Sequence, residues 1–152
     1  MDFGTGEEWG RLLAALAAGG ALGLRAELTH RPAGLRTHIL VSVGAAIFCL
    51  IAASYFDEHD TIDPLRALQG VASGIGLVAA ATVLKREGSV MGLTTAASVW
   101  VAAALGCDAA LGRPLRAVAL AAALTALNQL LRMIERRWLG TVPPKHAGRV
   151  IE

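Results

Sequence analysis

Five apolar segments, separated by short polar or glycine- and proline-containing breaks, set the pattern of this chain. None of them alternates apolar and polar residues with the period of two that is typical of a half-buried strand, and alanine, a strong helix former, dominates. The pattern therefore predicts helices and disfavours strands. The five predicted helices cover residues 9–24, 39–56, 67–84, 91–111 and 115–131.

The length of these segments matches that of membrane-spanning helices. Crossing the hydrocarbon core takes about 20 residues, with a range of about 17–25, so segment 9–24 is marginal and the others fit. The second, third and fourth segments contain no Lys, Arg, Asp or Glu apart from Asp108. A soluble bundle would carry charges along one face of each helix, and a chain of 152 residues cannot bury five helices that are apolar all round. We therefore predict an all-α integral membrane protein, with a bundle of five transmembrane helices over residues 9–131 and a basic tail over 132–152.

Composition agrees with a protein whose main partner is membrane lipid. Hydrophobic residues make up 55% of the chain, against about 45–50% in soluble domains. Glycine accounts for 17 of the 152 residues, which is a larger share than the roughly 7% of soluble domains. The net charge of +2 is too small to indicate a nucleic-acid partner. Cys49 and Cys107 lie in apolar surroundings without metal-ligand spacing, so we expect small core residues.

Charge sidedness predicts how the helices are threaded. If the five helices alternate in direction, one side of the membrane carries 10 of the 14 basic residues and the other carries 8 of the 12 acidic residues. Basic loops stay in the cytoplasm. The predicted topology therefore has the N-terminus outside and the C-terminus inside.

Small residues recur at helix-packing spacing in two segments. Gly19 and Gly23 form one G-x-x-x-G step and Gly70 and Gly74 form another, and in lipid such steps allow helix backbones to approach closely. A phosphate-binding loop is the competing interpretation, but it requires a preceding strand. We expect helix packing, which also suggests a homo-oligomer.

The fourth segment opens with hydroxyl side chains, in the run "GLTTAASVW". Thr94, Thr95 and Ser98 can hydrogen-bond to their own helix or to a neighbouring one. Packing is the favoured interpretation, and a polar lining to the path of a small solute or ion is the alternative. Both interpretations stay open at this point.

The loop after the first segment concentrates polar residues. If the first helix continues to Leu28, Arg25 and Glu27 lie about 200° apart and cannot face the same neighbour. Glu27 could then meet Arg31 or Arg36 folding back from the loop. All four histidines are expected on loops. The loop is either a docking surface or a set of solvated charges that fixes topology. The candidate interaction residues are Arg25, Glu27, Arg31, Pro32, Gly34, Arg36, Thr37 and His38.

Catalytic motifs are missing from the sequence. No nucleophile–base pairing appears, and no acid or histidine is expected deep in a span, where ion pumps and proton-coupled carriers usually need one. The acidic run 57–63 could bind Mg²⁺ or Ca²⁺ weakly, but a solvated loop is favoured. We therefore expect no enzymatic activity, cofactor or metal site.

Three separated motifs resemble the MgtC/SapB family of bacterial inner-membrane proteins. They are "RPAGLRTHILVSVGAAIF", then "SGIG", which adds Ser73 and Gly76 to the packing residues, then "GLTTAASVWVAAALG". The resemblance implies a five-span membrane domain in the bacterial inner (plasma) membrane. About twenty residues follow the last predicted span, so the resemblance does not extend to the soluble C-terminal domain of many members.

The resemblance also implies a function. Members of this family are linked to survival in low magnesium and, in pathogens, to life inside host cells. They act through contacts with other inner-membrane proteins, including the ATP synthase, rather than by moving magnesium themselves. We therefore expect a non-enzymatic regulator, and the alternative is a small-solute or ion pathway related to Mg²⁺.

Overall fold

The computed structural model describes residues 6–55, 65–86 and 89–138. These residues form five helices and one short antiparallel hairpin, which confirms the predicted number of helices. Three helices, at Leu35–Ser54, Leu93–Ala110 and Pro114–Glu135, are long and apolar enough to cross a membrane. In chain order the elements are α1 (Gly6–Leu28), α2 (Leu35–Tyr55), α3 (Leu65–Ala80), β1 (Leu84–Arg86), β2 (Ser89–Met91), α4 (Leu93–Ala110) and α5 (Pro114–Trp138).

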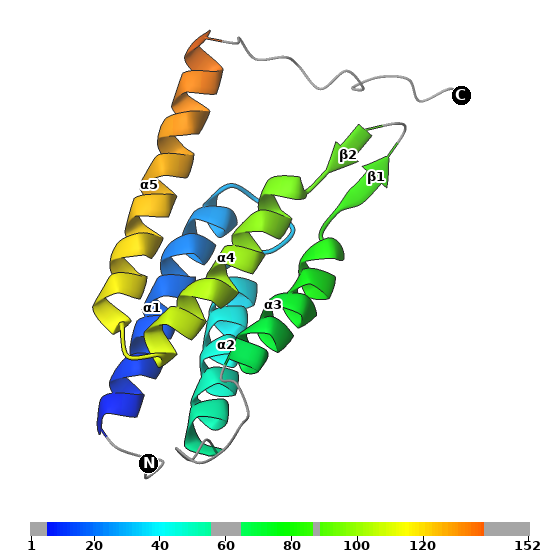
Figure 1. Cartoon of the computed structure of the whole chain (residues 1–152). Helices are drawn as coiled ribbons and strands as arrows, with labels where there is room; N and C mark the ends of the chain where they lie inside the picture. The colour runs from blue at the N-terminus through cyan, green and yellow to red at the C-terminus, as the bar shows by residue number, and fades with distance from the viewer. Residues whose placement is uncertain (1–5, 56–64, 87–88, 139–152) are drawn as a thin grey trace.

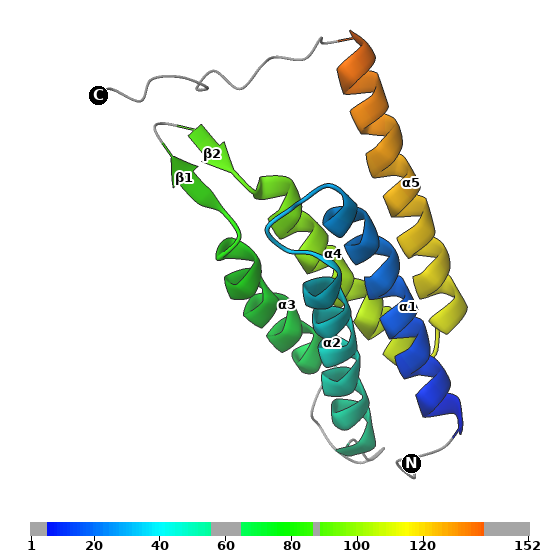
Figure 2. The ribbon, with the colours of Figure 1, turned by 180° about the vertical axis from the view of Figure 1, so that it is seen from behind.

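Three helices form the centre of the bundle. α1, α2 and α4 all pack against one another, as Figure 1 shows. α5 covers α1 and α4 on one side, and α3 lies on the opposite side, mainly against α4, as both views show (Figures 1 and 2). The contact between α3 and α2 is slight.

The hairpin between α3 and α4 corrects the sequence prediction. α3 ends at Ala80 rather than at residue 84, and Leu84 pairs with Met91 in the strands. The Thr82 hydroxyl donates to the carbonyl of Ala79 at 2.8 Å, which offers the backbone an alternative to continued helix. Gly92 then enters α4 with φ of +91°, a conformation that favours glycine. The strand prediction was wrong because these breaks are local and short.

The central helices touch backbone to backbone. A Cβ atom on Gly19 would lie 2.6 Å from the carbonyl oxygen of His38, and one on Gly23 would lie 2.8 Å from Cα of Leu35. On the other face of α2, a Cβ on Gly106 would collide with the carbonyl of Ser42. Glycines on α1 and α4 therefore set how closely α2 can approach both helices.

Ser42 lies at the crossing of these three helices. Its side chain is fully buried and its hydroxyl donates to the carbonyl of Ala15 in α1 at 2.8 Å. Its own backbone faces Gly106 of α4. One polar residue in an apolar helix thus lies at the contact with both neighbours.

Small residues fill the interior and large ones face outward. Among the described residues, thirteen of the eighteen buried hydrophobic residues are alanine. Leu115 is 86% exposed, Leu77 78% and Phe48 64%. In water such a surface would favour aggregation, whereas in lipid it costs nothing and small residues allow close helix packing.

A glycine-to-alanine pair tests the central packing. Gly106→Ala places a methyl group against the Ser42 backbone and should destabilise the fold by about 1–3 kcal/mol, because α2 and α4 must separate. Gly76→Ala meets no atom within 4 Å and should be neutral or stabilising by up to about 1 kcal/mol. Thermal unfolding of both variants in detergent measures the difference. Equal unfolding temperatures would contradict the packing described here.

Candidate functional site

The polar loop begins with a left-handed residue that ends α1. His30 has φ of 49°, its N–H donates to the carbonyl of Glu27 at 3.0 Å, and the N–H of Arg31 donates to the carbonyl of Ala26 at 3.1 Å. This pair of bonds is the Schellman motif, which reverses the chain at a helix end. The reversal turns Arg31 back over the bundle, where its Nη1 donates to Oγ1 of Thr95 in α4 at 3.5 Å.

Glu27 stabilises the start of α2. The backbone N–H of Leu35 donates to its Oε2 at 3.0 Å, and the carboxylate lies so close to Gly34 that a Cβ there would displace it. Among the described residues, neither Arg31 nor Arg36 forms an ion pair with Glu27, so the contact considered from the sequence does not form. The free N–H groups and the positive end of the α2 dipole offer Glu27 a fixed partner, whereas the loop arginines do not.

His38 joins the loop to α4. It lies in the first turn of α2 and is fully buried, so its expected place on a loop was wrong. Its Nδ1 lies 2.8 Å from the carbonyl of Gly34 and its Nε2 lies 2.9 Å from Oγ of Ser98. Because a carbonyl can only accept, Nδ1 donates to Gly34. Nε2 faces the Ser98 hydroxyl, whose Oγ also lies 2.8 Å from the carbonyl of Thr95.

We call these side chains the polar cluster. It brings the end of α1, the loop, the start of α2 and the start of α4 together. Thr95 is buried within it, whereas Thr94 is exposed. Among the described residues, no buried side-chain nitrogen or oxygen lacks a hydrogen-bond partner. The cluster consists of Glu27, Arg31, Gly34, His38, Thr95 and Ser98.

The other loop candidates lie outside the polar cluster. Pro32 and Arg36 are exposed and Thr37 is half-buried. Arg25 faces away from Glu27, as their angular separation on α1 requires. Arg25 lines a small cleft of about 20 Å³ between α1, α4 and α5, together with Arg31 and Arg132. Sequence reasoning did not anticipate that Arg132 reaches the first loop.

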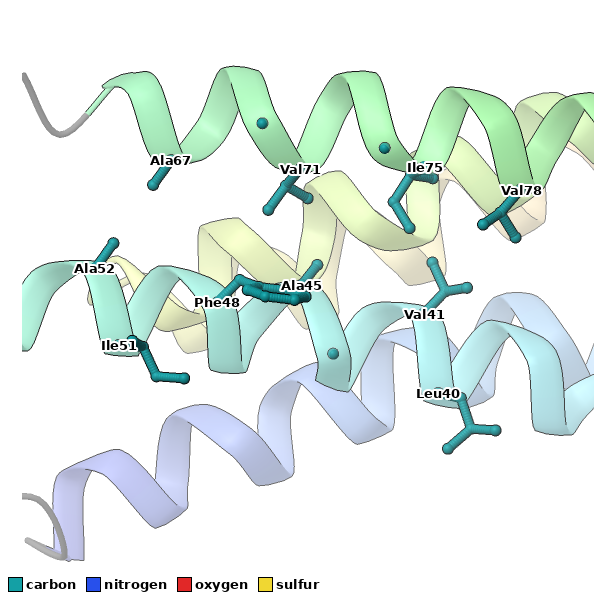
Figure 3. A pocket seen from close by; sticks show the side chains of 13 residues that line it. Leu40, Val41, Ala45, Phe48, Ile51, Ala52, Ala67, Val71, Ile75 and Val78 are labelled. Atoms are coloured by element: carbon teal, nitrogen blue, oxygen red, sulfur yellow. The ribbon is translucent and has the colours of Figure 1, made fainter.

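A much larger apolar groove lies between α2 and α3. It has a volume of about 740 Å³, and Figure 3 shows Val71, Ile75 and Val78 of α3 facing it. Gly70 and Gly74 line this groove, and a Cβ on either would meet no atom within 4 Å. The step formed by Gly70 and Gly74 therefore faces open space, whereas the step formed by Gly19 and Gly23 packs against α2. Gly76 also meets nothing within 4 Å, and Ser73 is exposed.

Two central residues were missed by sequence reasoning. Ser42 was treated as part of an apolar run, although a lone hydroxyl in such a segment is a signal for an interhelical hydrogen bond. Gly106 ends the third motif quoted above, but no second glycine four residues away marks it. The acidic run 57–63 lies outside the described residues, and so does the tail beyond residue 138.

These features define a helical protein with an apolar exterior and a hydrogen-bonded polar cluster at one end of the bundle. The MgtC family model matches residues 12–137, and the chain belongs to the MgtC family. This confirms the resemblance found from the three motifs.

Named relatives agree with this membership. Protein MgtC of Brucella abortus (strain 2308) is 36% identical over 121 residues, which cover 80% of this chain and 50% of that protein. YhiD of Escherichia coli (strain K12), named as a proposed magnesium transporter, is 39% identical over 101 residues, which cover 63% of this chain and 47% of that protein. Protein SrpB of Synechococcus elongatus is 43% identical over 107 residues, which cover 63% of this chain and 59% of that protein. The chain spans about half the length of the curated relatives it matches. No solved structure matches the chain.

A double-mutant cycle tests the contact between Glu27 and the start of α2. Glu27→Ala removes the acceptor for the Leu35 N–H and should cost about 0.5–2 kcal/mol of stability. Gly34→Ala puts a methyl group where the carboxylate lies and should cost a similar amount. Because both changes remove one interaction, the double variant should be little less stable than either single variant.

The control for this cycle is Gly44→Ala, whose Cβ would meet no atom within 4 Å. Denaturant unfolding in detergent measures the unchanged chain, the two single variants, the double variant and this control. A neutral Gly34→Ala variant, or fully additive losses, would contradict the proposed contact.

Proposed function

We propose that this chain is a multi-pass protein of the bacterial inner membrane, with five spans, the N-terminus outside and the C-terminus inside. α1 and α3 are the two spans that length and composition leave open. α1 packs along α2, α4 and α5, and its residues 12–24 carry no charge. Arg11 at one end donates to the carbonyl of Ala110 at 3.2 Å, so its position next to the end of α4 is that of a residue at the membrane boundary.

The placement of charge supports this threading. The loop between α1 and α2, the hairpin and the end of α5 all lie at the same end of the bundle (Figures 1 and 2). Basic residues at that end include Arg25, Arg36, Lys85 and Arg137. An end rich in lysine and arginine is the cytoplasmic end of a short-looped membrane protein. α3, with 16 residues, spans about 24 Å and crosses the core of about 30 Å only with local thinning.

Topology reporters test this arrangement. An enzyme that is active only in the cytoplasm should be active when fused after Glu152, and one that is active only outside should be active when inserted near Asp60. The reverse pattern at either site would contradict the proposed threading. Equal activity of both reporters at one site would contradict a single orientation.

We propose further that the protein is a non-enzymatic regulator that acts by contact with other membrane proteins. The groove between α2 and α3 is the observation that carries this proposal. Its apolar lining includes Gly44, Gly70 and Gly74, and nothing in the described chain fills it. Small residues along a lipid-facing groove allow another helix to approach closely. The exposed Arg36, near the cytoplasmic mouth, adds a polar contact for the same partner.

The proposed partner is an inner-membrane protein that supplies one transmembrane helix. The family resemblance adds the ATP synthase as a specific candidate, and a second copy of this chain is the other. The groove offers the same glycine face to either helix. The partner is therefore identified by what crosslinks to the groove.

A solute pathway is the second candidate function. The name of the relative YhiD favours it, because that protein is named for magnesium transport. Thr95 and Ser98 would be its polar lining, although both are engaged in hydrogen bonds with Arg31 and His38. Magnesium flux into liposomes that contain the purified protein, abolished by Thr95→Val, would favour this function over the regulator.

Site-specific photocrosslinking tests the regulator. A photoreactive residue at Val71, which lines the groove, should crosslink to a protein in living cells, whereas one at the exposed Leu77 should crosslink only to lipid. Gly74→Leu should abolish the Val71 product by filling the groove, and Gly76→Leu should leave it unchanged. A product of twice the chain mass identifies a second copy. Lipid adducts alone at Val71 would contradict the proposal.

A further inference from the structure

The cleft between α1, α4 and α5 carries three positive charges with no acid opposite them. Arg25, Arg31 and Arg132 line it, and no aspartate or glutamate does. Within the described residues, none of the three makes an ion pair. The acids nearest to them in sequence are Glu27, which is turned toward α2, and Glu135, which is exposed on α5 and does not line the cleft. Three like charges around one cleft repel one another, so an anion bound there would stabilise this arrangement.

The polar side chains that line the cleft offer unused hydrogen-bond donors, which suit a ligand that accepts hydrogen bonds. The hydroxyls of Thr29 and Thr125 already donate to carbonyls of their own helices, at 2.9 and 2.7 Å. Arg31 donates one N–H to Thr95, which leaves most of its guanidinium donors unused. Asn128, from α5, adds an amide with no hydrogen bond to the described chain. The cleft therefore holds a surplus of donors.

Guanidinium donors in this number select oxygens of a phosphate group. Each guanidinium presents a planar fork that bonds two phosphate oxygens at once, with greater strength than neutral hydrogen bonds. The three arginines come from α1, from the loop and from α5, so they can surround one group from different directions. Basic clefts between membrane helices are known sites for lipid headgroups.

We infer that this cleft binds the phosphate group of an anionic ligand through Arg25, Arg31 and Arg132. The cavity of about 20 Å³ admits a group about the size of one water molecule. One phosphate oxygen enters it, and the phosphorus stays at the rim, within reach of the three half-buried guanidinium groups. An anionic phospholipid and free inorganic phosphate share this chemistry. The site is separate from the groove between α2 and α3 and does not depend on the regulator proposal.

The binding test uses the full chain purified in detergent. Native mass spectrometry measures binding of phosphatidylglycerol against zwitterionic phosphatidylcholine, and thermal unfolding measures the effect of inorganic phosphate against chloride. Arg25→Gln/Arg132→Gln removes two of the three guanidinium groups. Lys85→Gln/Arg137→Gln is the matched control, because it removes the same charge from exposed positions at the same end of the bundle.

The cleft variant should bind phosphatidylglycerol at least about tenfold more weakly than the unchanged chain, and the control should keep the affinity. Binding should weaken as salt rises. If inorganic phosphate raises the unfolding temperature with the same dependence on these residues, the ligand is soluble phosphate; if only the lipid binds, it is a headgroup. Equal losses in both double variants, or no preference for either probe, would overturn the inference.

A conservative variant keeps the test valid if the glutamine variant does not fold. Arg25→Lys/Arg132→Lys retains the charges but loses the planar forks, so it should weaken binding several-fold. Unchanged affinity in a folded Lys variant would contradict recognition by guanidinium groups.

Discussion

The close contact of three helix backbones at Ser42 is the constraint on which the rest of the structure depends. Gly19 and Gly23 bring α1 onto α2, and Gly106 brings α4 onto its other face. At this distance the Ser42 hydroxyl reaches the backbone of α1, and His38 reaches Ser98 on α4. Larger residues at the glycine positions would separate the helices and break the polar bonds with them. The hydrogen bonds of Ser42 and His38 therefore depend on the close packing of the three helices.

This arrangement concentrates chemistry at one end of an apolar bundle. Every buried side-chain nitrogen and oxygen of the polar cluster has a hydrogen-bond partner, so the cluster locks the loop in place. The arginine cleft beside it has donors without acceptors, and the groove between α2 and α3 has apolar area without a helix. A rigid centre with two open surfaces suits a protein that responds to its neighbours in the membrane.

Periodicity and composition predicted the five helices, because apolar runs of this length leave little alternative in lipid. They did not predict the hairpin, which depends on Thr82 and the left-handed Gly92 rather than on any run. The loop motif was recognised, but its contacts were not. Glu27 prefers a helix N-terminus over an arginine, and His38 is buried because Gly23 leaves room for it. Such choices depend on three-dimensional neighbours that spacing along the chain does not reveal.

Disulfide formation between α1 and α2 tests the central contact most directly. In a chain carrying Cys49→Ala and Cys107→Ala, a Gly20→Cys/Ile39→Cys pair should oxidise rapidly in native membranes, because a Cβ on Gly20 would lie 3.9 Å from Cγ1 of Ile39 without a clash. A Gly10→Cys/Ile39→Cys pair should not, because a Cβ on Gly10 would meet no atom within 4 Å. Tryptic peptides joined within a monomer identify the product. Faster oxidation of the Gly10 pair, or joined peptides only in dimers, would contradict the account.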